Sequence, residues 1–386
     1  MLSSIRGLVF ALSLVTTAIV GTVHIIFVAF ISLFPLSRRA YRAVVDFVQW
    51  TWLANAAGLI ELLAGVRIHA DVDDLAAPHA GDRVVLIVMN HHCRLDWMFF
   101  WAVAARLRRC GTLKIALKDP MRKIPWFGWA MQAFLFIFLR RNDREGDLSR
   151  LRARLSHMVA HGDDVALLIF PEGTDLSPAN QAKDAEFVAK KGGALAPYAH
   201  LLHPRTAGFV EALKALVAAG RLDAIYDVTV RYDNHPAVAA SADPRPNELH
   251  LLKGHFPRAV HVEMARHTPW EEMKTDEGAA AWLMRLWDAK ERRLAAREPS
   301  AAGEGRALPL WLLASYLCFA TWWLAATTAV GWALVGAGGS WAWAWAVRLC
   351  TLVGTVALGI ATAKGGGLDL AELAFHPAPK IPSRAD

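Results

Sequence analysis

The chain has 386 residues, of which 55% are hydrophobic and 20% are charged, and its mean hydropathy is above zero. This composition is too apolar for an ordinary soluble domain and indicates association with a membrane. The net charge of +7 suits either nucleic acid or an anionic membrane surface, but apolar segments lie near both ends of the chain. We therefore expect the membrane surface as a partner and no nucleic acid.

The first element is an apolar helix, because no Asp, Glu, Lys or Arg occurs from Gly7 to Ser37. About 20 apolar residues are enough to cross a bilayer. A secretory signal has a shorter apolar region of roughly 7 to 15 residues and a small-residue cleavage site, and neither feature is present. Arg38, Arg39 and Arg42 follow the helix and only Arg6 precedes it. This bias predicts that the middle of the chain lies in the cytoplasm.

A second apolar stretch, Phe47 to Leu63, is bounded by Asp46 and Glu61 and is too short to cross a bilayer. It is typical of an interfacial helix or a core helix. We predict three parts in the chain: a membrane anchor over residues 1–40, a single globular domain over 41–297, and a hydrophobic hairpin with a tail over 298–386.

The middle of the chain alternates strand-like and helix-like stretches, which is an α/β pattern. The predicted strands are Val84–Met89, Leu113–Leu117, Phe134–Leu139, Val165–Phe170, Ala224–Tyr232 and Ala259–Ala265, and the predicted helices include Leu148–Ala160 and Thr206–Ala218. We found no repeat of fixed period. One domain therefore accounts for the whole region.

A histidine and an aspartate follow the first predicted strand. His91 and Asp96 are separated by four residues and come directly after the apolar run Val84 to Met89. A neutral imidazole can accept a proton from an alcohol near pH 7, and a carboxylate on its other ring nitrogen fixes the tautomer. This pair predicts a general base at a strand end.

Three further polar clusters each follow a predicted strand: residues 118–132, 138–141 and 170–175. Arginine donates paired hydrogen bonds to phosphate, so Arg140 or Arg141 is a candidate for binding one. Gly173 permits close backbone approach and the Thr174 hydroxyl can contact an oxyanion. We expect Glu172, which is acidic, to orient a hydrogen-bond donor or a substrate hydroxyl.

The apolar zone from Leu308 to about Thr362 is interrupted by a Gly- and Ser-rich stretch at 336–340, which is typical of a tight turn between two helices. Basic residues before the zone and Lys364 after it place both ends on the cytoplasmic side. Arg348 lies inside the second arm. Either its side chain reaches the interface from near the turn, or the hairpin enters the bilayer without crossing it.

Other enzyme classes find little support. A metal site built from His91, His92, Cys93 and Asp96 would need four ligands within six residues, and H-E-x-x-H is absent; we expect no metal. The G-x-S-x-G motif of serine hydrolases and the P-loop of nucleotide-binding enzymes are absent as well. A non-enzymatic lipid-binding or scaffold protein remains an alternative. The four cysteines include no C-x-x-C pair, so we expect reduced thiols.

Four motifs, taken in chain order, resemble those of the glycerolipid acyltransferase family, which includes 1-acylglycerol-3-phosphate acyltransferases. They are N-H-x-x-x-x-D-W at 90–97, Lys118 with G-W-x-x-Q at 128–132, F-[IL]-x-R at 138–141 and F-P-E-G-T at 170–174. Asp175 stands where the family usually has Arg. Three features together resemble the lysocardiolipin acyltransferase branch and its bacterial relatives. They are Asp175, the motif L-H-P-R-T at 202–206 and the motif K-G-H-F-P-R at 253–258. The resemblance covers about residues 40 to 270.

The resemblance implies a single mixed-sheet α/β acyltransferase domain, flanked here by an N-terminal transmembrane helix and a C-terminal hydrophobic hairpin. It implies transfer of a fatty acyl group from acyl-CoA or acyl carrier protein to the hydroxyl of a lysophospholipid, with no bound cofactor. His91 would be the base and Asp96 its orienting carboxylate. Lys118, Arg141 and the turn Glu172-Gly173-Thr174 would bind the acceptor.

The expected acceptor is 1-acylglycerol-3-phosphate, giving phosphatidic acid, and lysophosphatidylglycerol and lysocardiolipin are alternatives. Asp175 removes one positive charge from the expected phosphate site, which leaves the headgroup open but not the reaction class. His92 competes for the base role, but only His91 has the family spacing to Asp96. The segment 203–206 is expected to be scaffold, either behind the site or around the acyl tunnel, rather than catalytic. We expect an integral protein of the bacterial inner membrane with its catalytic domain facing the cytoplasm.

Overall fold

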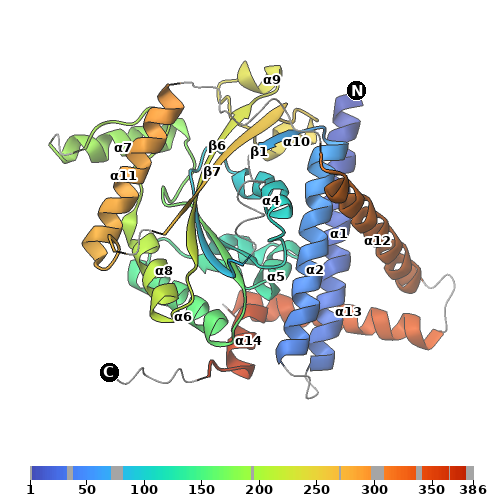
Figure 1. Cartoon of the computed structure of the whole chain (residues 1–386). Helices are drawn as coiled ribbons and strands as arrows, with labels where there is room; N and C mark the ends of the chain where they lie inside the picture. Colours follow the sequence, from blue (N-terminus) through green and yellow to red (C-terminus); the bar gives the residue numbers. More distant parts are fainter. Residues whose placement is uncertain are drawn as a thin grey trace.

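The computed structural model describes residues 2–32, 38–70, 81–192, 195–268, 271–296, 308–335, 341–364 and 366–379. The predicted turn at 336–340 and the boundary between domain and hairpin near 298 lie outside these residues. The described part forms an α/β domain with long apolar helices at one side (Figure 1).

Seven strands form one mixed sheet in the order β1-β7-β6-β2-β5-β3-β4. Their bounds are β1 Arg67–Ala70, β2 Val84–Met89, β3 Leu113–Lys118, β4 Ile137–Leu139, β5 Val165–Ile169, β6 Ala224–Asp233 and β7 Ala259–His267. Strands β6, β2, β5, β3 and β4 are parallel to one another, and β7 pairs antiparallel with β6. The predicted mixed sheet is confirmed.

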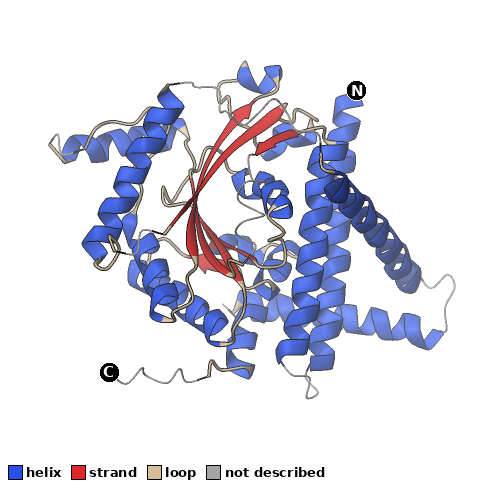
Figure 2. Ribbon diagram, in the orientation of Figure 1, coloured by secondary structure: helices blue, strands red, loops and turns tan. Residues whose placement is uncertain are grey.

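Helices cover both faces of the sheet, as Figure 2 shows. The bounds of the helices are α1 Leu2–Ser32, α2 Arg38–Gly58, the π-helical turn η1 Leu59–Leu63, α4 Asp96–Arg106, the 3₁₀ helix η2 Asp119–Lys123, α5 Phe127–Ala133, α6 Arg144–Ala160, α7 Pro178–Lys190, α8 Thr206–Ala218, α9 Pro236–Ala239, α10 Glu248–Leu252, α11 Asp276–Ala295, α12 Leu310–Val335, α13 Trp341–Ala363 and α14 Leu368–Phe375.

Strand β2 shows why a continuous apolar run forms the centre of this sheet. Val85 and Ile87 point into a core shared with α1, α2 and α4. Val84 and Leu86, one residue out of phase, point into a second core shared with α6, α8 and α11. Side chains alternate between the two faces of a strand, so a strand with helices on both faces must be apolar at every position.

One predicted strand was too long. Phe134 to Leu139 is apolar throughout, but only Ile137–Leu139 pairs with β3. Phe134 ends α5, and Leu135 has φ +58°, which breaks the extended conformation. Phe134 and Phe136 are buried in the core but belong to a turn, not to a strand. An apolar run alone does not distinguish a buried turn from a buried strand. The short edge strand Arg67–Ala70 was not predicted.

The predicted helix over Phe47–Leu63 is the second part of a longer element, α2 followed by η1. Its buried side chains include Val45, Trp52 and Leu53, which join the core between α1 and the sheet. Of the two interpretations, interfacial or core, the packing favours the core helix.

Among the residues that the structure describes, three helices are long and apolar enough to cross a membrane: Leu2–Ile26, Leu310–Ala333 and Trp345–Ala363. This confirms apolar helices at both ends and indicates membrane association. Helices α12 and α13 extend away from the domain (Figure 1) and are mostly exposed, with 22% of each span buried, against 50% for α1. Helix α1 instead lies along the domain.

Helix α1 contacts the globular part near its start and again in its second half. Near its start, Arg6 Nη2 donates to the Gly254 carbonyl over 3.1 Å, and Phe10 packs edge-on against Phe256. Further along, Thr22 Oγ1 donates to the Trp126 carbonyl over 2.9 Å. The K-G-H-F-P-R motif at 253–258 thus provides a packing surface for α1.

The last helix, α14, returns to the domain through buried ion pairs. Asp369 pairs with Arg122 at 2.8 Å and with Arg154 at 2.7 Å. Glu372 pairs with two arginines of α2 and lies near one histidine of α6. We call this group the α14 ion-pair cluster, and its members are Asp369, Glu372, Arg38, Arg42, Arg122, Arg154 and His157.

Candidate active site

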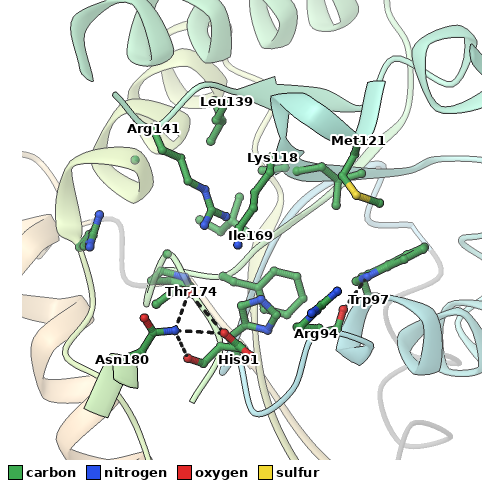
Figure 3. Close-up of a pocket in the computed structure, with 18 of the residues that line it drawn as sticks. His91, Arg94, Trp97, Lys118, Met121, Leu139, Arg141, Ile169, Thr174 and Asn180 are labelled. Carbon is green, nitrogen blue, oxygen red and sulfur yellow. Dashed lines mark hydrogen bonds between the residues drawn. The ribbon is translucent and has the colours of Figure 1, made fainter. Parts of the chain in front are cut away.

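The parallel strands β2, β5, β3 and β4 carry their following loops to the same edge of the sheet, because the carboxyl ends of parallel strands coincide. The four polar motifs follow these four strands. They meet at a cavity of about 1050 Å³ whose lining includes His91, Lys118, Arg141, Gly173 and Thr174 (Figure 3). The predicted site residues Asp96 and Glu172 lie behind its wall.

The structure joins His91 and Asp96 by a hydrogen bond of 2.9 Å between Nδ1 and Oδ2. Asp96 is the first residue of α4 and is fully buried. Because an ionised carboxylate can only accept, we assign the ring hydrogen to Nδ1 and a lone pair to Nε2. Nε2 has no hydrogen-bond partner among the described residues. Phe170 stacks on the imidazole with ring centroids 4.3 Å apart and limits its rotation.

Three donors besides the histidine hold Asp96 in place. The Cys93 backbone N–H donates to Oδ2 at 3.0 Å, and the Cys93 thiol donates to Oδ1 at 3.1 Å. Tyr232, on β6, donates its hydroxyl to Oδ1 at 2.6 Å. Burial and the Asp96 charge both raise the pKa of Tyr232 and of Cys93 well above their ordinary values. Both groups therefore remain protonated donors, and Asp96 remains the acceptor.

His92 has a different environment from its neighbour. Its ring stacks on Tyr232 at 5.3 Å, and no hydrogen bond joins it to Asp96 in the described part of the chain. Burial lowers the pKa of His92. The tandem pair is thus divided, with one ring on the cavity wall and the other packed against a tyrosine.

Glu172 does not reach the cavity. It is 2% exposed, and its carboxylate accepts from the His91 backbone N–H at 3.1 Å and from the Leu202 backbone N–H at 3.3 Å. Burial raises the pKa of Glu172 to about 8, against the opposing effect of these two N–H groups and of Lys290. The side chain therefore joins two loops rather than facing a substrate.

The turn at Gly173 and Thr174 lines the cavity. Gly173 has φ +74°, a conformation that favours glycine. Asn180 donates to Thr174 Oγ1 at 2.9 Å and to the Asp175 carbonyl at 2.9 Å. Asp175 in turn pairs with Arg245 at 2.8 Å. This network fixes the turn before any ligand binds.

Two of the predicted cations enter the cavity. Figure 3 shows Lys118 and Arg141 reaching in from one side, with His91 on the other. Arg141 has φ +68°, and its backbone N–H and that of Arg140 donate to the Asp147 carboxylate at 2.6 and 2.7 Å. This turn directs Arg141 inward, and Arg140 is not part of the lining.

Sequence reasoning missed Tyr232, Asn180 and Arg245, and it assigned Arg205 to scaffold although Arg205 lines the cavity. Tyr232 is 136 residues from Asp96. Its place at the end of a predicted strand was the available signal. The neighbour relation of β6 and β2 was needed to use it.

Comparison with known proteins finds a matching family model and several similar acyltransferases. The family model described as Acyltransferase matches residues 71–233. The chain is 38% identical over 290 residues to lysocardiolipin acyltransferase 1 of Danio rerio, covering 75% of this chain and 70% of that protein. It is 33% identical over 290 residues to the probable 1-acyl-sn-glycerol-3-phosphate acyltransferase 5 of Arabidopsis thaliana, covering 75% and 72%.

A third relative is lysophosphatidylinositol acyltransferase 10 of Caenorhabditis elegans, at 31% identity over 297 residues, covering 76% of this chain and 72% of that protein. Among solved structures, the 1-acyl-sn-glycerophosphate (LPA) acyltransferase PlsC of Thermotoga maritima is 18% identical, with a TM-score of 0.43, and the match covers 76% of this chain and 98% of that one.

Proposed function

The chain belongs to the acyltransferase family that includes lysocardiolipin and 1-acyl-sn-glycerol-3-phosphate acyltransferases, and on that basis we propose that it transfers a fatty acyl group from a thioester donor to the free hydroxyl of a lysophospholipid. The observation that carries this proposal is the 2.9 Å hydrogen bond between His91 and buried Asp96 at the wall of a large cavity. The arrangement leaves one basic ring nitrogen available to a substrate hydroxyl.

In the proposed reaction, His91 Nε2 accepts the proton of the acceptor hydroxyl as its oxygen attacks the thioester carbonyl. The new C–O bond forms, the C–S bond breaks, and the proton passes from His91 to the departing sulfur. Asp96 stabilises the imidazolium that exists between these steps. No nucleophilic side chain and no bound cofactor are needed, because acyl-CoA or acyl carrier protein brings the activated acyl group.

The acceptor side of the proposal uses Lys118 and Arg141, whose charges face the cavity, together with the Gly173-Thr174 turn. Cations and backbone N–H groups suit a phosphate ester. Glu172 does not contact the acceptor in this proposal. Its two hydrogen bonds set the position of His91 relative to the segment after Leu201.

The proposed acceptor is 1-acylglycerol-3-phosphate, which the transfer would convert to phosphatidic acid. Another lysophospholipid, such as lysophosphatidylglycerol or lysocardiolipin, is the alternative. The relatives include proteins named as lysocardiolipin acyltransferases and proteins named as 1-acyl-sn-glycerol-3-phosphate acyltransferases. A protein that binds such lipids without turnover is the non-enzymatic alternative.

The proposed location is the bacterial inner membrane, with the domain facing the cytoplasm, where thioester donors occur. Supporting this side, Arg38 at the start of α2 pairs with Asp163 at 2.6 Å. The pair ties the basic segment after α1 to the globular domain. Basic segments beside apolar helices favour the cytoplasmic side of a membrane, so we place this segment and the domain there together.

The test is an acyl-transfer assay with the detergent-solubilised protein. A panel of lysophospholipids is offered with labelled acyl-CoA and, separately, with labelled acyl carrier protein. We expect a labelled, acylated phospholipid product with at least one acceptor. Lysolipid binding without transfer from either donor would contradict the proposal and favour the lipid-binding alternative.

A further inference from the structure

Asp175 contributes no positive charge to the cavity, and its own negative charge is already paired. Arg245 Nη1 lies 2.8 Å from Asp175 Oδ2, and the same guanidinium binds Asp243 at 2.6 Å. One arginine thus faces two carboxylates. This part of the wall has no cation to spare for an anionic ligand.

Arg205 reaches the same turn from another segment. Its backbone N–H donates to the Pro171 carbonyl over 2.7 Å, and its side chain crosses Gly173. A Cβ at position 173 would lie 3.3 Å from Arg205 Cδ and 3.4 Å from Nε. Such contacts are tighter than ordinary van der Waals packing, so the glycine leaves room for the arginine to pass over the turn.

Glu172 and Pro171 fix where the Arg205 segment lies. The Glu172 carboxylate binds the backbone N–H groups of both His91 and Leu202. The loop that leads to Arg205 is therefore joined to the loop that holds His91. A group bound by Arg205 has a defined position relative to the basic nitrogen of His91.

Lys118, Arg141 and Arg205 all line the cavity, and none has a carboxylate within ion-pair distance in the part of the chain that the structure describes. Partial burial, and then the charge of Arg205, lower the pKa of Arg141. Partial burial, and then the charge of Arg141, lower the pKa of Lys118. Three neighbouring cations repel one another, and a bound anion offsets that repulsion.

We propose that Arg205 completes an anion cradle with Lys118 and Arg141, and that this cradle binds the phosphate of the acceptor lipid. The inference rests on the proposed function and adds a residue that determines acceptor recognition. The third cation comes from the residue that precedes α8, while Asp175 pairs with Arg245 and orders the turn.

The proposal is tested with Arg205→Ala, Arg205→Gln and Arg205→Lys, and with Arg67→Ala as the control, because Arg67 is an exposed arginine at the start of β1. With 1-acylglycerol-3-phosphate as acceptor, Arg205→Ala and Arg205→Gln should raise the acceptor KM about 10- to 100-fold, the usual value of a charge-assisted hydrogen bond. The donor KM should stay within about twofold, as expected when a uniform binding contact is lost. Arg205→Lys should recover part of the loss, and Arg67→Ala should match the wild type.

Binding to His91→Ala protein, measured calorimetrically, separates recognition from turnover. Adding Arg205→Gln should weaken binding of 1-acylglycerol-3-phosphate and leave binding of a monoacylglycerol of the same chain length unchanged. If the wild type transfers acyl groups but the Arg205 variants keep its acceptor KM, or change only the donor KM, the role of Arg205 alone is overturned. Absence of transfer by the wild type would instead defeat the proposed function.

Discussion

The α14 ion-pair cluster and the anion cradle are both groups of basic side chains, but they differ in what faces the charges. In the cluster, Asp369 and Glu372 are 3% and 4% exposed and lie against the basic groups around them. In the cradle, the three cations face an open cavity without carboxylate partners in the described residues. Removing one partner of a paired buried charge destabilises the fold, whereas an unpaired charge at a cavity is available to a ligand.

Asp369→Ala is the substitution expected to have the largest effect on the α14 ion-pair cluster. It would leave Arg122 and Arg154 buried without their shared carboxylate, so the free energy of unfolding should fall by about 3 to 5 kcal/mol. Asp276→Ala is the control, because its ion pair with Lys214 is exposed on both sides and should be worth less than about 1 kcal/mol. Thermal unfolding in detergent measures both, and equal losses would contradict a stabilising role for the cluster.

The pH dependence of the cluster gives a second, somewhat smaller effect. Burial alone would raise the pKa of Glu372, but Arg42, His157 and Arg38 together lower it to about 2 from an ordinary value of 4.5. A depressed acid pKa stabilises the folded state above the unfolded pKa, and this contribution, about 3 kcal/mol, is lost as the pH falls from about 4.5 toward 2.

The measurement compares unfolding of the wild type with that of Glu372→Gln between pH 7 and pH 3. We expect a constant difference in stability above about pH 5.5 that narrows as the medium becomes more acidic. A difference that widened on acidification would show that Glu372 is protonated in the folded state, and the cluster would then not be ionic.

On the cavity side, Tyr232→Phe should change turnover more than stability. The substitution removes the 2.6 Å hydrogen bond to Asp96 but keeps the ring that stacks on His92. Loss of one donor to a charged group predicts about a tenfold fall in kcat, with the acceptor KM nearly unchanged. Steady-state kinetics separates the two parameters, and a change in KM alone would place Tyr232 in lipid binding instead.

Sequence patterns predicted the parts of this site that depend on local spacing. His91 and Asp96 lie five positions apart, and a strand end followed by a helix start brings them together without help from the rest of the fold. The same holds for the turn at Gly173. Apolar runs gave most strands for a similar reason, since a sheet covered on both faces needs them.

The remaining parts depend on contacts between distant segments. Arg205 reaches the Gly173 turn only because its loop crosses the end of β5, and Tyr232 reaches Asp96 because β6 lies beside β2. A count of charges likewise cannot separate Arg122, which binds Asp369, from Arg141, which faces the cavity. Strand order and helix docking decide these pairings, and a single sequence contains neither explicitly.

The central claim, that the cavity is an acyl-transfer site served by His91, is tested most directly by comparing His91→Ala with His92→Ala in the same assay. The two residues are adjacent, so each variant controls for the local effect of the other. We expect His91→Ala to lose about 10²- to 10⁴-fold in turnover, the usual contribution of a general base, while the protein still folds and His92→Ala retains most of its activity. Equal losses, or a greater loss in His92→Ala, would contradict the account.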